Sequence, residues 1–120
     1  MIFYIKTKLG DEFPIVFNQE SMSWFVSENN LSYNEVAEMG GFMDWPVKLF
    51  HNYLIACFEI ACDEKGRKFP YMDRKQFNKW LVSDSTIMEQ CMKYWLESQP
   101  KHEAGAEGVK KQTQTVRKGR

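Results

Sequence analysis

The stretch from residue 44 to residue 62 is apolar on most sides when it is placed on a helix. One stripe of that helix holds Val47, Phe50, Leu54, Cys57, Phe58 and Ala61, and Leu49, Tyr53 and Ile60 cover much of the remainder. A helix that is apolar on most sides has to be surrounded by other elements. The sequence therefore predicts a fold that is built around this central helix.

Both ends of the central helix carry local signals. We expect the side chain of Asp44 to cap the first turn, with Pro46 inside that turn, where its missing N–H leaves no intrahelical hydrogen bond unmade. The polar run from residue 63 to residue 67, which contains Gly66, predicts the end of the helix.

A β-hairpin is predicted before the helices. Residues 2–6 and 13–17 are rich in β-forming side chains, and the second run alternates apolar residues on one face. Gly10 and Asp11 give the turn signal between the two runs. An isolated hairpin is only marginally stable in water, so we expect helices to cover its apolar face.

Capping signals divide the remaining sequence into four further helices. Asn18 and the box Ser32–Glu35 begin two short helices, and the second of these stops at the Gly40-Gly41 pair. Asp73 begins a third helix, and Ser83-Asp84-Ser85 separates it from the last one. In the first helix the predicted inward side chains are Met22, Phe25 and Val26, and in the second they are Val36 and Ala37. In the third they are Phe77, Trp80 and Leu81, and in the last they are Ile87, Cys91, Tyr94 and Trp95. The fold class is therefore mainly α, a small domain of about five helices with an N-terminal β-hairpin.

The formal net charge of zero conceals two oppositely charged parts. Residues 101–120 hold six Lys and Arg residues against two Glu, a balance of +4, which leaves −4 for residues 1–100. This C-terminal segment has no aromatic residue, so it buries too little apolar surface to offset the entropy of ordering it. We predict a folded domain over residues 1–99 and a disordered basic tail over residues 100–120, with Pro100 at the boundary.

Several classes of protein are disfavoured by the sequence. The longest uninterrupted apolar run, from Tyr53 to Phe58, is far too short to span a bilayer, and residues 1–20 lack the features of a secretory signal. The three cysteines form no CxxC motif, which favours a reducing compartment. We therefore expect a cytoplasmic protein without membrane contact.

No residues form a recognisable catalytic, metal or cofactor motif. Cys57 and Cys62 lie roughly 140° apart around a helix, so they do not readily share a metal ion. His51 and Cys91 lack the glycine motifs that accompany catalytic nucleophiles, and Gly40-Gly41 lacks the context of a phosphate-binding loop. We expect no catalytic residues, no metal and no cofactor, and therefore a protein that is not an enzyme.

The segment from residue 39 to residue 45 has two interpretations. Its aromatic and methionine side chains flank a flexible glycine pair. They either pack on the central helix or form a patch for a protein partner, since Met and aromatic side chains are favoured at adaptable interfaces.

The order of these elements resembles that of tail assembly chaperones of long-tailed bacteriophages. The likeness covers most of residues 13–99. It is carried by residues 17–30 and by the segments DWPVKLFHNYLIACFEIACDEKGRKF, MDRKQFNKWLVSDS and TIMEQCMKYWLESQP. It lies in the pattern of helices and their spacing rather than in a signature motif.

The resemblance implies a non-enzymatic role in the cytoplasm of the host bacterium. Such proteins bind the long, helical, hydrophobic tape measure protein, keep it in solution and help tail tube subunits polymerise around it. Many copies serve one client, so the resemblance also implies a homo-oligomer. The predicted partner-binding surfaces are the segment 42–45 and the exposed parts of residues 22–25. The residues named for them are Met22, Phe25, Phe42, Met43 and Trp45.

A different function is predicted if the basic tail is the active part. Lys110, Lys111 and Arg117 would then contact phosphates, as in a small nucleic-acid-binding or regulatory protein. The tail has no aromatic residue for base stacking and the body is acidic, and both observations argue against nucleic acid as the partner. The alternative is a tail that improves solubility or tethers a partner. The charge division also suggests that the tail of one copy reaches the acidic body of another copy.

Overall fold

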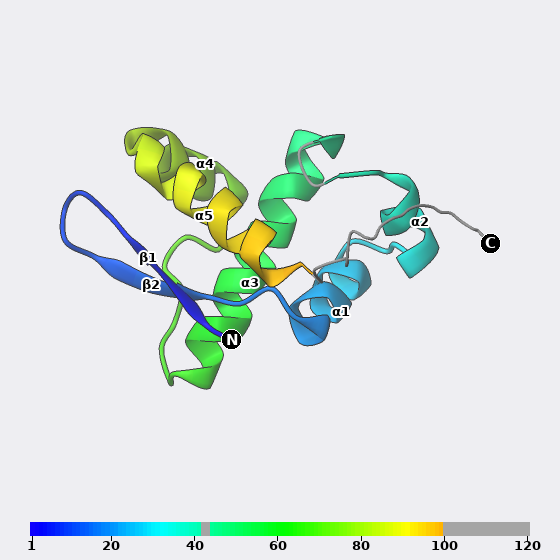
Figure 1. Ribbon diagram of the computed structural model, residues 1–120, viewed down its shortest axis with the longest axis horizontal. Helices are drawn as coiled ribbons and strands as arrows, with labels where there is room; N and C mark the ends of the chain where they lie inside the picture. The colour runs from blue at the N-terminus through cyan, green and yellow to red at the C-terminus, as the bar shows by residue number, and fades with distance from the viewer. Residues whose placement is uncertain (42–43, 100–120) are drawn as a thin grey trace, which may run out of the picture.

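The helix predicted at the centre is the longest element of the structure. The computed structural model describes residues 1–41 and 44–99. In sequence order the elements are β1 (Phe3–Lys6), β2 (Glu12–Ile15), α1 (Gln19–Glu28), α2 (Tyr33–Glu38), α3 (Val47–Glu64), α4 (Arg74–Ser83) and α5 (Ser85–Ser98) (Figure 1). The mainly helical fold with an N-terminal hairpin is confirmed. The predicted disordered tail lies outside the described residues.

Helix α3 is surrounded by other elements, as its apolar sides require. It packs against α1, against β2 and against α4. Its buried residues are Phe50, His51, Tyr53, Leu54, Ile55, Ala56, Cys57, Phe58, Ile60, Ala61 and Cys62. The ends of the long axis are formed by α1 and α2 on one side and by the hairpin loop on the other (Figure 1).

The start of α3 differs from the prediction. Pro46 occupies the N-cap position, with φ −53° and ψ 140°, and the carbonyl of Pro46 accepts the first helical hydrogen bond from Phe50 at 2.9 Å. Asp44 lies two residues earlier and makes no capping bond. The physical reason is that a residue before proline is pushed out of the helical region, so Trp45 cannot begin the helix. The predicted Asp44 cap is therefore wrong.

The other predicted helix starts are confirmed. Asn18 accepts a hydrogen bond from the amide of Ser21 at 2.9 Å, and Ser32 accepts one from the amide of Glu35 at 3.1 Å. In both cases the partner side chain also accepts from the cap backbone, which completes a capping box. Asp73 caps α4 through the amide of Gln76 at 3.2 Å.

The hairpin pairs β1 and β2 in antiparallel register, with Phe3 opposite Ile15 and Lys6 opposite Glu12. Its loop contains Gly10 with a φ of +97°, in the region that favours glycine. Beyond β2, the amide of Val16 donates to the carbonyl of Cys57 at 3.3 Å, which fixes the hairpin to α3.

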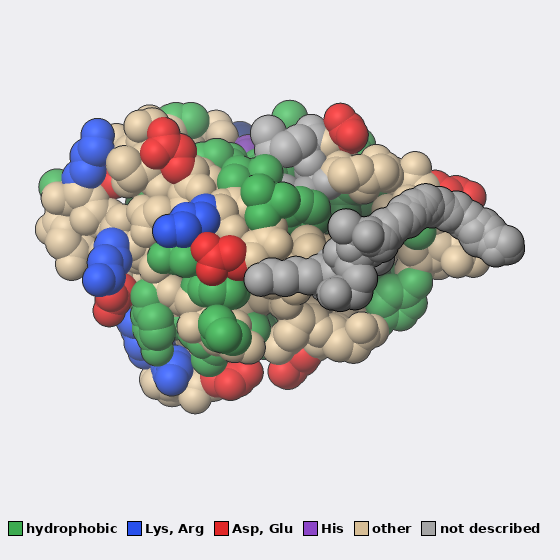
Figure 2. Space-filling view, viewed as in Figure 1, with side chains coloured by type: hydrophobic (Ala, Val, Ile, Leu, Met, Phe, Trp, Pro, Cys, Tyr) green, Lys and Arg blue, Asp and Glu red, His purple; other side chains and the backbone are tan. Residues whose placement is uncertain are grey.

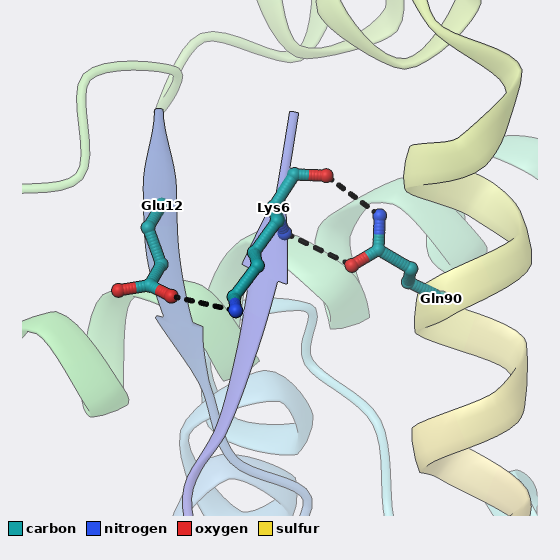
Figure 3. Close-up of polar contacts among 3 residues, drawn as sticks. All are labelled: Lys6, Glu12 and Gln90. Carbon is teal, nitrogen blue, oxygen red and sulfur yellow. Dashed lines mark hydrogen bonds and ion pairs between the residues drawn. The ribbon is translucent and has the colours of Figure 1, made fainter. Parts of the chain in front are cut away.

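Helix α5 covers the outer edge of β1 with one side chain. The amide of Lys6 donates to Oε1 of Gln90 at 2.9 Å, and Nε2 of Gln90 donates to the carbonyl of Lys6 at 2.7 Å (Figure 3). The side chain of Gln90 thus pairs with the edge as a neighbouring strand would. Nζ of Lys6 also lies 3.8 Å from Oε2 of Glu12 in an exposed ion pair, which contributes little to stability.

Asp84 joins the hairpin loop to the junction of α4 and α5. Its carboxylate caps α5 by accepting from the amide and hydroxyl of Thr86 at 3.0 and 2.7 Å. It also accepts from the amide of Lys8 at 2.8 Å. These hydrogen bonds lower the pKa of the Asp84 carboxyl, with the bond from the Thr86 side chain as the largest cause.

Aromatic side chains fill the core on both sides of α3. On one side, Phe25 of α1 packs against Trp45 and Tyr53. On the other side, Phe58 stacks on Phe69 with ring centroids 4.6 Å apart. The rings that join this second cluster are Phe13, Tyr71, Phe77 and Trp80.

Candidate functional site

Two of the predicted partner-binding residues lie in the core. Phe25 is fully buried and Trp45 is 8% exposed. Their rings stack at 5.4 Å with an interplanar angle of 9°, and the indole N–H of Trp45 donates to the carbonyl of Gly40 at 3.1 Å. Packing of this kind leaves little of Phe25 and Trp45 at the surface. A partner contact through these two side chains stays a prediction.

The remaining predicted contact residues have different placements. Met22 is half-buried and packs against the core from α1. Phe42 and Met43 lie outside the described residues, and so do the tail residues Lys110, Lys111 and Arg117.

The exposed aromatic side chain of α1 is Trp24, which lies within the predicted surface of residues 22–25 but was not among the residues named for it. Trp24 is 42% exposed, and its indole N–H donates to Oε1 of Glu59 on α3 at 2.9 Å. Trp24 lies one residue before Phe25, so it faces about 100° away from it around the helix. A tryptophan off the inward stripe of an amphipathic helix was the signal that could have identified it.

Trp24 lines a groove between α1 and α3, which we call the α1–α3 groove. The groove has a volume of about 300 Å³. Its lining residues are Trp24, Phe25, Glu28, Asn29, Asn52, Ile55, Ala56, Glu59 and Met72. Ile55 and Ala56 are buried and form an apolar floor, whereas Met72 on the loop after α3 is 44% exposed.

A second hollow extends the groove along α3. It also measures about 300 Å³, and it shares Glu59 and Met72 with the first. The side chains that complete its lining are Asp63, Arg67, Lys68 and Phe69. Together the two hollows form a trough with apolar side chains at its centre and charged groups along its rim.

The groove opens on the acidic part of the molecule. From residue 16 to residue 47, the part of the chain that contains α1 and α2, there are five Asp and Glu residues and no Lys or Arg. Glu28 and Glu59 belong to the groove, and Asp63 belongs to its extension. Figure 2 shows Lys and Arg side chains toward the hairpin side of the face in view and none over α1 and α2. The groove therefore suits a partner that carries positive charge.

His51 is packed inside the fold. It is 5% exposed, between the rings of Phe50 and Phe77, and its Nδ1 has no hydrogen-bond partner within the described residues. Burial lowers the pKa of the His51 imidazole, and the positive charge of Arg74 lowers it further. This environment keeps His51 neutral at physiological pH.

The three cysteines are free and buried. Burial raises the pKa of the Cys57 thiol to about 12, and it also raises the pKa of Cys62 and Cys91. A thiol in that state carries little of the thiolate that nucleophilic chemistry requires. Among residues 1–41 and 44–99, no three His, Cys, Asp or Glu side chains lie where they could hold a metal ion.

The described helices also lack the length and apolar character needed to cross a membrane. Comparison with known proteins adds no assignment, since no family model, curated protein or solved structure matches the chain. The α1–α3 groove, with its exposed Trp24 and Met72, is the candidate functional site.

Proposed function

We propose that the protein is a non-enzymatic tail assembly chaperone of a long-tailed bacteriophage. In this proposal it binds the tape measure protein in the cytoplasm of the host, without a cofactor, and assists tail tube polymerisation around it. The resemblance of residues 13–99 to that family supports the proposal. The single structural observation that supports it best is the α1–α3 groove.

The groove has the properties that an apolar helical client requires. An amphipathic helix inserts side chains spaced at i, i+3, i+4 and i+7 into a hydrophobic groove. Ile55 and Ala56 supply the floor for such side chains, and Trp24 and Met72 flank them. Tryptophan is enriched among the residues that dominate binding energy, and Met adapts to varied surfaces. Covering the apolar stripe of the client would keep it from aggregating.

Self-association is part of the proposal, because one long client needs many copies. The acidic end formed by α1 and α2 complements the Lys and Arg side chains on the other elements. A contact between unlike surfaces of successive copies repeats head to tail, and it yields a ring or an open filament. An open helical arrangement would follow a long client.

Co-expression with the tape measure protein tests the proposal. The soluble fraction of the client is measured after centrifugation, with the wild-type chain and with the double variant Trp24→Ala/Met72→Ala. We expect the wild type to keep the client in solution and the groove variant to lose most of that effect. The matched control is Val82→Ala/Leu96→Ala, which truncates two side chains that are 75% and 62% exposed outside the groove.

The control variant should behave as the wild type does. Circular dichroism first establishes that both variants are folded. If the groove variant keeps as much client in solution as the wild type, the groove is not the client site. If the wild type has no effect on the client, the chaperone function itself is refuted.

A further inference from the structure

The α1–α3 groove leaves apolar side chains uncovered between negative charges. Trp24 and Met72 are about half exposed, and the carboxylates of Glu28 and Glu59 lie beside them. Long basic side chains match such a surface, because their aliphatic stems cover apolar atoms while their charged heads reach carboxylates. The lining of the groove holds Glu28 and Glu59 and no Lys or Arg, so the groove fits a peptide segment that is rich in Lys and Arg and carries a few aliphatic residues.

The chain itself contains a segment of this kind. Residues 101–120 carry six Lys and Arg residues and two Glu, with Val109 and Val116 as their β-branched aliphatic residues. Lys110 and Lys111 follow directly after Val109, so an aliphatic side chain and two positive charges are adjacent. The balance of +4 in this segment complements the balance of −4 in residues 1–100.

Two packed side chains connect the end of α5 to the groove. Trp95, in the last turns of α5, forms a side-chain hydrogen bond with Tyr53 of α3. The ring of Tyr53 lies 5.4 Å from that of Phe25, and Phe25 lines the groove. The eleven residues from 100 to 110 span up to about 36 Å when extended, and the two shorter dimensions of the molecule are 30 and 26 Å. The tether is therefore long enough for Lys110 and Lys111 to reach the groove.

We propose that segment 101–120 docks into the α1–α3 groove of its own molecule, with Lys110 and Lys111 beside Glu28, Glu59 and Asp63. A short tether gives the second partner an effective concentration in the millimolar range, so weak contacts are sufficient for docking in the same molecule. Salt weakens the contact, because the charges involved lie at the surface.

Docking in the same molecule has a consequence for any client of the groove. The segment covers Trp24 and Met72 while no client is present, and a client that binds the groove has to displace it. The segment thereby protects an apolar surface that would otherwise favour non-specific association. This inference concerns the chain alone and holds whatever the client is.

Zero-length coupling of amines to carboxylates tests the docking on the full chain. A carbodiimide joins a Lys side chain to a carboxylate only when the two are in contact, and mass spectrometry identifies the joined peptides. We expect Lys110 and Lys111 to couple to Glu28, Glu59 and Asp63 in the monomeric product at 50 mM NaCl. At 500 mM NaCl the yield should fall at least fivefold. The experiment contains no client, so its result does not depend on the proposed chaperone function.

Charge reversal provides the matched comparison, with coupling to Glu59 as the readout. Glu28→Lys/Asp63→Lys should lower that coupling at least fivefold, whereas Glu38→Lys/Glu89→Lys, the same charge change outside the groove, should leave it unchanged. Adding Lys110→Glu/Lys111→Glu to the variant Glu28→Lys/Asp63→Lys should restore coupling with the roles exchanged. The new carboxylates at positions 110 and 111 should then couple to the new amines at positions 28 and 63.

Three results would overturn the proposal. The first is coupling of Lys110 and Lys111 to carboxylates all over the surface in proportion to their exposure. The second is an unchanged yield of coupling to Glu59 in the variant Glu28→Lys/Asp63→Lys. The third is coupling found only in a dimeric product, which would show that the segment contacts a second copy instead.

Discussion

At the scale of single residues, His51 combines burial with an unpaired polar atom. It is 5% exposed between two phenylalanine rings, and Nδ1 has no partner within the described residues. An unpaired polar atom in the interior costs stability, and a charged imidazole there would cost more. Burial, followed by the charge of Arg74, lowers the pKa of His51 in the folded state.

This environment predicts how stability depends on pH. Because the pKa of His51 is lower in the folded state than its usual value of about 6.5, the unfolded state binds the proton first. Above pH 6.5 the protonation of His51 does not reduce the free energy of unfolding. The free energy of unfolding then declines as the pH falls from 6.5 toward the lowered folded-state pKa. Urea denaturation at pH 5.0, 6.0 and 7.5 should show stability decreasing with acid, and His51→Leu should flatten this dependence. Equal slopes for the two proteins would contradict the account.

Trp24 and Phe25 show how far the sequence could predict the site. The helical period correctly placed Phe25 and Val26 inside. It could not identify Trp24 as a contact residue, because the groove is formed only when α3 and the loop at Met72 meet α1. It also left the burial of Trp45 open, since that depends on stacking against Phe25 from another element.

At the scale of elements, the hairpin is held at its two edges by side chains from α5 and from the loop after α3. Gln90 pairs with the backbone of Lys6 at the edge of β1, and Arg67 donates to the carbonyl of Glu12 at the edge of β2 at 3.1 Å. Strand edges with unpaired backbone groups invite pairing with other chains. These contacts occupy part of each edge, and they attach a two-stranded sheet that would be marginal alone.

Gln90 should therefore be a stabilising residue of α5. Its two hydrogen bonds to Lys6 are partly exposed, and each is worth about 0.5–1.5 kcal/mol. Gln90→Ala should lower the free energy of unfolding by about 1–2 kcal/mol in urea denaturation. Gln90→Glu should lower it too, because it replaces the donating Nε2 by an oxygen that faces the carbonyl of Lys6. Glu89→Ala, at the exposed neighbouring position, is the control. A Gln90→Ala variant as stable as this control would refute the role of Gln90.

Prediction of the elements succeeded where the signal was local and failed at the start of α3. The caps at Asn18, Ser32 and Asp73 act over three residues, so the sequence alone could identify them. At Asp44 two local rules conflicted, and the restriction imposed by Pro46 on Trp45 outweighed the capping preference of aspartate. The role of Gln90 could not be predicted, because it contacts a residue 84 positions away.

At the scale of the whole molecule, charge is unevenly distributed. The five acidic residues between positions 16 and 47 have no basic residue among them, and α1 and α2 form one end of the long axis (Figure 1). The proposed head-to-tail association relies on this asymmetry. Sedimentation velocity on the full chain should show larger species at 50 mM NaCl than at 500 mM NaCl, because salt screens exposed charges. A monomer at both concentrations would contradict the proposed self-association.

The central claim is that the α1–α3 groove binds an apolar helical client. Its most direct test is the dissociation constant between the full chain and a soluble segment of the tape measure protein. Side chains that dominate an interface contribute 2 kcal/mol or more, so Trp24→Ala should weaken binding at least about thirtyfold, and Val82→Ala should leave it unchanged. Equal affinity of the wild type and Trp24→Ala for the client would contradict the claim.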